Sequence, residues 1–283
     1  MTVPYFKLKY NIKVENVMTT DMPVTFFEWV YFLVNQYGVM LAKGAMVTLL
    51  LALVGTFIGC IIGLLVGIVQ TIPINPRASL VTRYFYKTVQ FLLSAYIEVF
   101  RGTPMIVQAM VVYYGSMSMF DLDMSAMFAG FLVVSINTGA YMAETVRGGI
   151  YSIDVGQTEA AKAIGMNHFQ TMYNVVLPQA FRNIMPQVGN NLIINIKDTS
   201  VLNVISVTEL YFASKTAAGV YYKYFEVFFI TCVIYFVLTF TVSRLLRWIE
   251  RKMDGSDNYS LVEYDPMADP CGPFDIANKK GRN

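Results

Sequence analysis

One stretch of the sequence, from Met46 to Ile68, contains no charged residue at all. About 20 consecutive apolar residues are enough to cross the hydrocarbon core of a bilayer as a helix. Four further stretches of comparable length are candidate spans, although the fourth span is more polar than the others, so the sequence predicts about five transmembrane helices. Their expected positions are 46–68, 91–114, 124–143, 186–207 and 226–243. The expected fold class is an all-α, polytopic membrane protein.

The composition agrees with this fold class and excludes several functions. Hydrophobic residues make up 55% of the chain and charged residues 14%, whereas soluble domains are closer to a quarter charged. The net charge of +2 gives no support for a nucleic-acid partner. A single histidine and three scattered cysteines argue against a metal site, a Ser-His-Asp triad or a disulfide framework.

Three regions are expected along the chain. Residues 1–37 form a polar N-terminal extension that ends in an aromatic segment, Phe26–Val34, which is too short to span a bilayer. We expect this segment to be an interfacial amphipathic helix. Residues 38–252 form the transmembrane domain, and residues 253–283, which are polar and lack periodicity, form a disordered cytoplasmic tail.

Glycine recurs every fourth residue in the first span, at Gly55, Gly59, Gly63 and Gly67. Such spacing leaves a groove on one helix face, which another helix can approach closely. Packing within the subunit is the favoured interpretation, and a contact between subunits is the alternative.

A segment of different character, residues 154–178, lies between the third and fourth spans. Asp154 is placed to cap a short alanine-rich helix, and Gly165 is placed to end it in a left-handed conformation. A second short helix, 169–176, is expected to end at Pro178. The sequence therefore predicts a small polar helical hairpin between two membrane spans.

The hairpin carries Glu159-Ala160-Ala161, then Gly165 after three residues, then Val175-x-Leu177-Pro178 after nine more. This pattern resembles the EAA loop of binding-protein-dependent ABC importer permeases. Three other motifs resemble the polar amino acid branch of that family (histidine, glutamine, glutamate, arginine and opine permeases). They are Phe100–Pro104, Gly139–Glu144 with Val146–Gly149, and Lys197–Ser200. The resemblance extends from about Gly38 to Lys252.

The resemblance implies a type I ABC importer permease fold in which the EAA loop is a cytoplasmic coupling helix. It implies two ATPase subunits that carry ATP and Mg, a second permease (the same chain or a related one) and an extracytoplasmic amino-acid-binding protein. The coupling residues would be Glu159, Ala160, Ala161, Gly165, Leu177 and Pro178. The chain has no GxxxxGK[ST] loop, so we expect it to bind no cofactor and to be no enzyme by itself.

The fourth span is unusually polar for a transmembrane helix. Charged residues at mid-bilayer are costly, so they are expected to face protein or water. With Asn137 of the third span, the candidate residues of a translocation path are Asn191, Asn195, Asp198, Thr199 and Ser200. The alternative, weighed equally, is that these residues make hydrogen bonds between helices.

Two pairs of opposite charges are spaced one helical turn apart, Glu98 with Arg101 and Glu144 with Arg147. Thr103 and Pro104 follow the first pair, where Gly102 and Pro104 are expected to kink the helix. These residues are candidates either for a gate or for structural pairing between helices.

The positively charged segments predict the orientation. Arg77, Arg83 and Lys87 precede the second span, and Arg244 to Lys252 follow the fifth. The positive-inside rule places both segments and the hairpin in the cytoplasm, with the N-terminus outside and the C-terminus inside. The expected location is a bacterial cytoplasmic membrane. The alternative functions are a Na⁺- or H⁺-coupled secondary transporter, which usually shows an internal repeat, and a membrane scaffold without transport.

Overall fold

The computed structural model describes residues 23–72 and 79–254, and every regular element in them is helical. In chain order the elements are α2 (Phe26–Thr71), α3 (Leu80–Gly102), α4 (Met105–Phe120), α5 (Ala126–Tyr151), α6 (Val155–Ala163), α7 (His168–Thr171), the π-helical η2 (Met172–Val176), α8 (Leu177–Asp198), the 3₁₀-helical η3 (Thr199–Ile205), α9 (Leu210–Tyr221) and α10 (Tyr224–Asp254). The predicted all-α fold class is confirmed. Most of the predicted N-terminal extension and nearly all of the predicted tail lie outside the described residues.

The first helix is one continuous element where the sequence predicted two. α2 is 46 residues long, which corresponds to roughly 70 Å at the helical rise. It therefore includes both the aromatic segment and the first span, and there is no structural boundary near residue 37. The reason is packing, since Trp29, Leu33, Tyr37 and Leu41 recur at helical spacing and are all buried against other helices.

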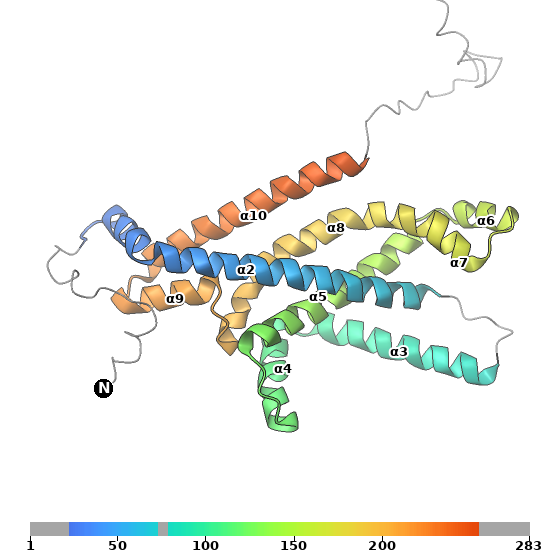
Figure 1. Ribbon diagram of the computed structural model, residues 1–283, viewed down its shortest axis with the longest axis horizontal. Coiled ribbons are helices and arrows are strands. Elements are labelled where there is room, and N and C mark those ends of the chain that lie inside the picture. Colours follow the sequence, from blue (N-terminus) through green and yellow to red (C-terminus); the bar gives the residue numbers. More distant parts are fainter. Residues whose placement is uncertain (1–22, 73–78, 255–283) are drawn as a thin grey trace, which may run out of the picture.

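The long helices α2 and α5 lie side by side along the middle of the molecule (Figure 1). The four glycines of α2 lie one helical turn apart and face α5. From Gly55 to Gly67 they pack, one by one, on Val134, Thr138, Met142 and Val146. Residue numbers increase in the same direction along both helices at this contact, so the two helices run parallel. The glycine groove thus packs within the subunit, as the favoured interpretation predicted.

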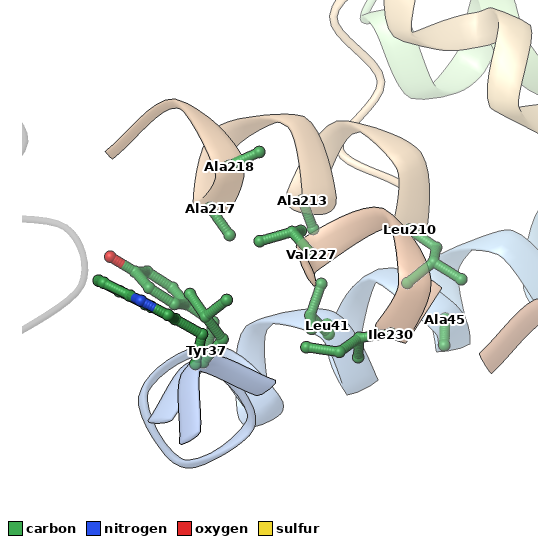
Figure 2. Close-up of a cluster of buried hydrophobic side chains, with 11 residues drawn as sticks. Tyr37, Leu41, Ala45, Leu210, Ala213, Ala217, Ala218, Val227 and Ile230 are labelled. Carbon is green, nitrogen blue, oxygen red and sulfur yellow. The ribbon is translucent and has the colours of Figure 1, made fainter. Parts of the chain in front are cut away.

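Three clusters of buried side chains hold the bundle together. One lies at the end formed by α9, which we call the α9 end. Figure 2 shows Tyr37 and Leu41 of α2, Ala213 of α9 and Val227 of α10 in that cluster. A second joins α5 to the middle of α2, α4 and η3. A third joins α5 to η2 and α8, next to α6 and α7, at what we call the hairpin end.

The helix boundaries correct several predicted spans. The second span is divided into α3 and α4, and α8 begins at Leu177, well before the predicted start of the fourth span. The third span does not end at its charged pair, because α5 continues to Tyr151. A helix between the fourth and fifth spans, α9, is not among those that the sequence predicts. Among the residues that the structure describes, three helices, α2, α5 and α10, are long and apolar enough to cross a membrane by themselves.

Candidate functional site

The helix α6 is closed at both ends by local hydrogen bonds. At its start, the Asp154 carboxylate accepts a hydrogen bond from the Gly156 N–H at 2.6 Å. At its end, Gly165 has φ +88°. The Gly165 N–H donates to the Lys162 carbonyl at 3.0 Å, and the Met166 N–H donates to the Ala161 carbonyl at 3.1 Å. These two bonds form a Schellman motif. The predicted start and end of this helix are confirmed.

The second half of the hairpin differs from its prediction. Asn167 and Gln170 form a capping box at the start of α7. The chain then continues through η2 into α8 without a break, so Pro178 ends no helix. In the π-helical turn the Leu177 N–H donates to the Met172 carbonyl, five residues back. Pro178 follows in the first turn of α8, where a missing N–H is tolerated because first-turn N–H groups have no partner within their own helix.

The hairpin presents large apolar side chains at its surface. Ile164, Phe169 and Tyr173 are 75%, 76% and 65% exposed. The Phe169 and Tyr173 rings stack with centroids 6.2 Å apart. Large apolar side chains that are exposed on one short segment are candidates for a protein–protein interface. We call these three residues the hairpin patch.

The six predicted coupling residues divide between this surface and its support. Glu159, Ala160, Gly165 and Pro178 are exposed, and Leu177 is half-buried. Ala161 is buried, because α6 packs on η2 and α7. The small side chain at this position is therefore explained by packing of the hairpin itself, and the surface open to another protein comes from the other positions.

The break between α3 and α4 falls at Thr103-Pro104, as predicted, and is closed by side-chain amides. Pro104 has no N–H, so carbonyl groups of the preceding turn lose their helical partners. The Gln108 amide nitrogen donates to the carbonyls of Phe100 and Thr103 and lies near the Thr103 hydroxyl, each at 2.9 Å. The Asn137 amide nitrogen donates to the Phe100 carbonyl at 3.1 Å and to Gln108 Oε1 at 2.9 Å. Asn137 thus fixes the break onto α5.

Of the two predicted charged pairs, one forms within its helix and the other does not. Glu144 pairs with Arg147, as the spacing predicted. Arg101 also lies 3.8 Å from Glu144 and is stacked over the Tyr141 ring. Glu98 is exposed and has no ion pair among residues 23–72 and 79–254. Arg101 therefore connects α3 to α5 instead of pairing within its own helix.

With Asn137, described above, four of the polar residues proposed for the path make hydrogen bonds within the bundle. The buried Asn195 amide nitrogen donates to the hydroxyls of Thr56 at 2.7 Å and Thr138 at 2.9 Å, which joins α8 to α2 and α5. The buried Asn191 amide nitrogen lies 3.1 Å from the Met142 sulfur. The buried Thr199 hydroxyl donates to the Ile196 carbonyl at 3.1 Å. These hydrogen bonds are the kind that the alternative interpretation, polar contacts between helices, predicts.

The other members of the set are open to their surroundings. Asp198 is exposed and Ser200 half-buried, both at the point where α8 becomes η3. The adjacent Lys197 lines a hollow of about 240 Å³ between α8 and α10, together with Arg247. These groups remain available for contact with a ligand or a second chain.

Two polar side chains with central positions were missed by the sequence reasoning. Gln108 closes the helix break, and Glu209 is a fully buried acid at the start of α9. Glu209 could have been noticed as the one acidic residue between Asp198 and Glu226. Gln108 gave no such signal, because a glutamine four residues after a proline is unremarkable before the break is known.

Comparison with known proteins shows what this arrangement resembles. Residues 74–255 match the family described as binding-protein-dependent transport system inner membrane component. The arginine transport system permease protein ArtQ of Bacillus subtilis is 33% identical over 57% of this chain and 74% of that protein. The glutamine transport system permease protein GlnP of Escherichia coli K12 is 36% identical over 56% of this chain and 73% of that protein.

Solved structures show the same helical arrangement. A crystal structure of an amino acid ABC transporter with histidines has a chain that aligns with a TM-score of 0.70 and 36% identity. That alignment covers 82% of this chain and 100% of the other. A chain of the inward-facing MetNI methionine ABC transporter aligns with a TM-score of 0.61, over 75% of this chain and 95% of the other. At 21% identity this second likeness concerns the fold alone.

Proposed function

Because this chain belongs to the binding-protein-dependent transport system inner membrane components, we propose that it forms half of the membrane path of an ATP-driven importer of polar amino acids. The similar proteins are permease subunits of amino acid transport systems, and a chain of a solved amino acid ABC transporter has the same fold. Two of these relatives are named as arginine and glutamine permeases, and this supports a polar amino acid as the cargo.

The observation that carries the proposal is the rigid, exposed hairpin. α6 has a cap at its start and a Schellman motif at its end, and the hairpin patch stands beside it. Hydrogen bonds at both ends hold this short helix in place. Such a helix can transmit the movement of a bound protein to the helices behind it. We propose that an ATPase subunit docks here, one for each of two permeases, and carries the ATP and Mg.

The distribution of positive charge supports a cytoplasmic position for the hairpin. The start of α3, with Arg83 and Lys87, lies toward the same end of the molecule as α6 and α7, and so does the end of α10 (Figure 1). That end of α10 carries Arg244, Arg247, Arg251 and Lys252. By the positive-inside rule the hairpin end is cytoplasmic, and the α9 end faces the amino-acid-binding protein.

The complex can be tested by transport. The chain would be purified with its co-purifying subunits, reconstituted into proteoliposomes, and supplied with its binding protein and radiolabelled arginine, glutamine, glutamate or histidine. We expect uptake that requires ATP on the hairpin side and persists when Na⁺ and H⁺ gradients are collapsed by ionophores. Uptake that needs an ion gradient and no ATP would contradict the proposal. The family membership gives no support to such a secondary transporter.

A further inference from the structure

Glu209 is an acid whose side chain has no exposed surface and no ion-pair partner among residues 23–72 and 79–254. Its Oε1 accepts a hydrogen bond from the Phe212 N–H at 2.7 Å. Its Oε2 accepts one from the Tyr211 N–H at 2.8 Å. The hydroxyls of Tyr235 and Thr48 also point to Oε2, at 3.2 and 3.5 Å. One carboxylate therefore joins α9 to α10 and α2.

The neighbouring backbone completes a closed ring of hydrogen bonds. The Leu210 N–H donates to the Thr48 hydroxyl at 3.2 Å, so the first three N–H groups of α9 all have partners. Helix α2 comes close enough because residue 44 is glycine. A β-carbon there would lie 2.9 Å from the Leu210 Cα and 3.1 Å from the Glu209 carbonyl oxygen. Gly44 and Thr48 are one turn apart and face α9 together.

The geometry of the ring fits a carboxylate. Each of the two oxygens accepts from a backbone N–H group, and a carboxylate is the side chain that offers two such acceptors. A glutamine would place its NH₂ group against one of these N–H donors. The Thr231 hydroxyl also donates to the Ser214 hydroxyl at 2.6 Å, which gives α9 a second polar link to α10.

The position of this ring links two parts of the bundle. On one side, α8 changes to the 3₁₀-helical η3 after the exposed Asp198, and the chain then turns at Ser206 with φ 65°. On the other side lies the buried cluster of α2, α9 and α10 at the α9 end. Glu209 stands between them, three residues after the turn. Movement of the α9 end can reach η3 through this short connection, beside the direct packing of η3 on α9 and α2.

We propose that Glu209 is a positioning residue that makes α9 move as one body with α2 and α10, so that the α9 end and the η3 segment shift together during transport. This inference rests on the transport function proposed above. The carboxylate acts through α9, and it is assigned no contact with the cargo. Removing it should disconnect movement at the α9 end from the path while the hairpin end stays intact.

The first experiment separates the local structure from transport. For Glu209→Gln in the complete complex, we expect hydrogen exchange of the α9 amides to accelerate at least about tenfold and ATP-driven uptake to fall by a similar factor. The basal ATPase rate and the yield of complex should stay within about twofold of wild type. The control is Glu226→Gln, which removes a partly exposed ion pair with Lys223 and should change each readout by less than about twofold.

Unchanged α9 exchange, or uptake within about twofold of wild type, would overturn the proposal. If Glu209→Gln fails to assemble, Thr48→Val and Tyr235→Phe decide, since each removes one donor to the carboxylate. We expect each to accelerate α9 exchange and reduce uptake by a smaller factor, and no effect in either would contradict the role. The exchange measurement does not depend on transport, so a wild-type complex without ATP-driven uptake would refute the proposed function separately.

A disulfide that joins α9 to α10, which we call the staple, tests whether Glu209 acts by positioning α9. Ser214→Cys with Thr231→Cys, in a background in which the three native cysteines are serine, would join α9 to α10 directly where the two hydroxyls now meet. If Glu209 acts by positioning α9, the oxidised staple in the Glu209→Gln background restores both slow exchange and uptake. Restored exchange without restored uptake would show that the carboxylate has a different role.

Discussion

Gly63 of α2 lies so close to Met142 of α5 that a β-carbon at position 63 would be 2.3 Å from the Met142 Cβ. The same carbon would lie 2.8 Å from the Ala143 backbone nitrogen, so a change of side-chain rotamer cannot relieve the overlap. The parallel contact of α2 with α5 therefore depends on glycine at this position.

We expect Gly63→Ala to destabilise the protein by about 1–3 kcal/mol, because an overpacked contact must push two helices apart. The measurement is the apparent melting temperature in detergent, followed by size-exclusion chromatography. Gly115→Ala is the matched control, since no atom lies within 4 Å of a carbon added there. Equal stability of the Gly63 variant and wild type would contradict the packing account.

The break between α3 and α4 depends on the Gln108 amide, which donates to the carbonyls left without helical partners. In Gln108→Leu the Thr103 carbonyl loses its side-chain donor, while the Phe100 carbonyl keeps Asn137. We expect a loss of about 1–3 kcal/mol, the cost of leaving a half-buried carbonyl without a partner. Thermal unfolding in detergent measures it, with Gln187→Leu on the exposed face of α8 as the control. A loss no larger than that of the control would show that water satisfies the break.

A substitution of Asn195 tests whether this residue holds helices together or contacts the cargo in the translocation path. Its amide joins the hydroxyls of Thr56 and Thr138, so Asn195→Leu should lower stability by about 1–3 kcal/mol and leave the preference among amino acids unchanged. Asn190→Leu, an exposed neighbour on the same helix, is the control. The opposite pattern, normal stability with a KM raised by about tenfold or more, would place Asn195 in contact with the cargo.

The sequence predicted well those features that depend on residues close together in the chain. Asp154 and Gly165 fix a helix start and a helix end by local chemistry, and both were found where expected. The spacing of the α2 glycines likewise indicated a close helix contact, although not its partner. Such signals need no knowledge of the rest of the fold.

The features that were missed depend on distant partners. The sequence predicts a helix end at Pro178, but this proline lies in the first turn of α8, directly after the π-helical turn. The role of Glu209 depends on Thr48, which is 161 residues away in sequence. Arg101 similarly lies beside Glu144 of another helix, whereas its spacing in the sequence predicts an ion pair with Glu98. Periodicity carries no information about such contacts.

Gly165 provides the most direct mutational test of the hairpin. Its φ of +88° disfavours any residue with a branched side chain, although no atom lies within 4 Å of an added carbon. We expect Gly165→Val to abolish uptake with normal membrane insertion, because roughly 1–2 kcal/mol of backbone strain would disturb the Schellman motif. Uptake assays and membrane fractionation measure the two effects.

Two further variants test whether backbone conformation is the cause. Gly165→Asn should retain part of the uptake, since asparagine tolerates the left-handed region better than valine. Gly148→Val adds the same side chain near the same end of the bundle, where no atom lies within 4 Å and φ is ordinary. We expect it to have little effect. Normal uptake by Gly165→Val would remove the hairpin from the coupling mechanism.

The measurement that tests the central claim most directly is the composition of the complex in native membranes. Tagged protein would be extracted in mild detergent and every co-purifying chain identified and quantified. We predict a separate ATPase with a phosphate-binding GxxxxGK[ST] loop, present in an amount equal to that of the permease chains and lost when the hairpin patch is replaced by polar residues. Recovery of the chain without any ATPase, under conditions that keep a known ABC importer intact, would contradict the account.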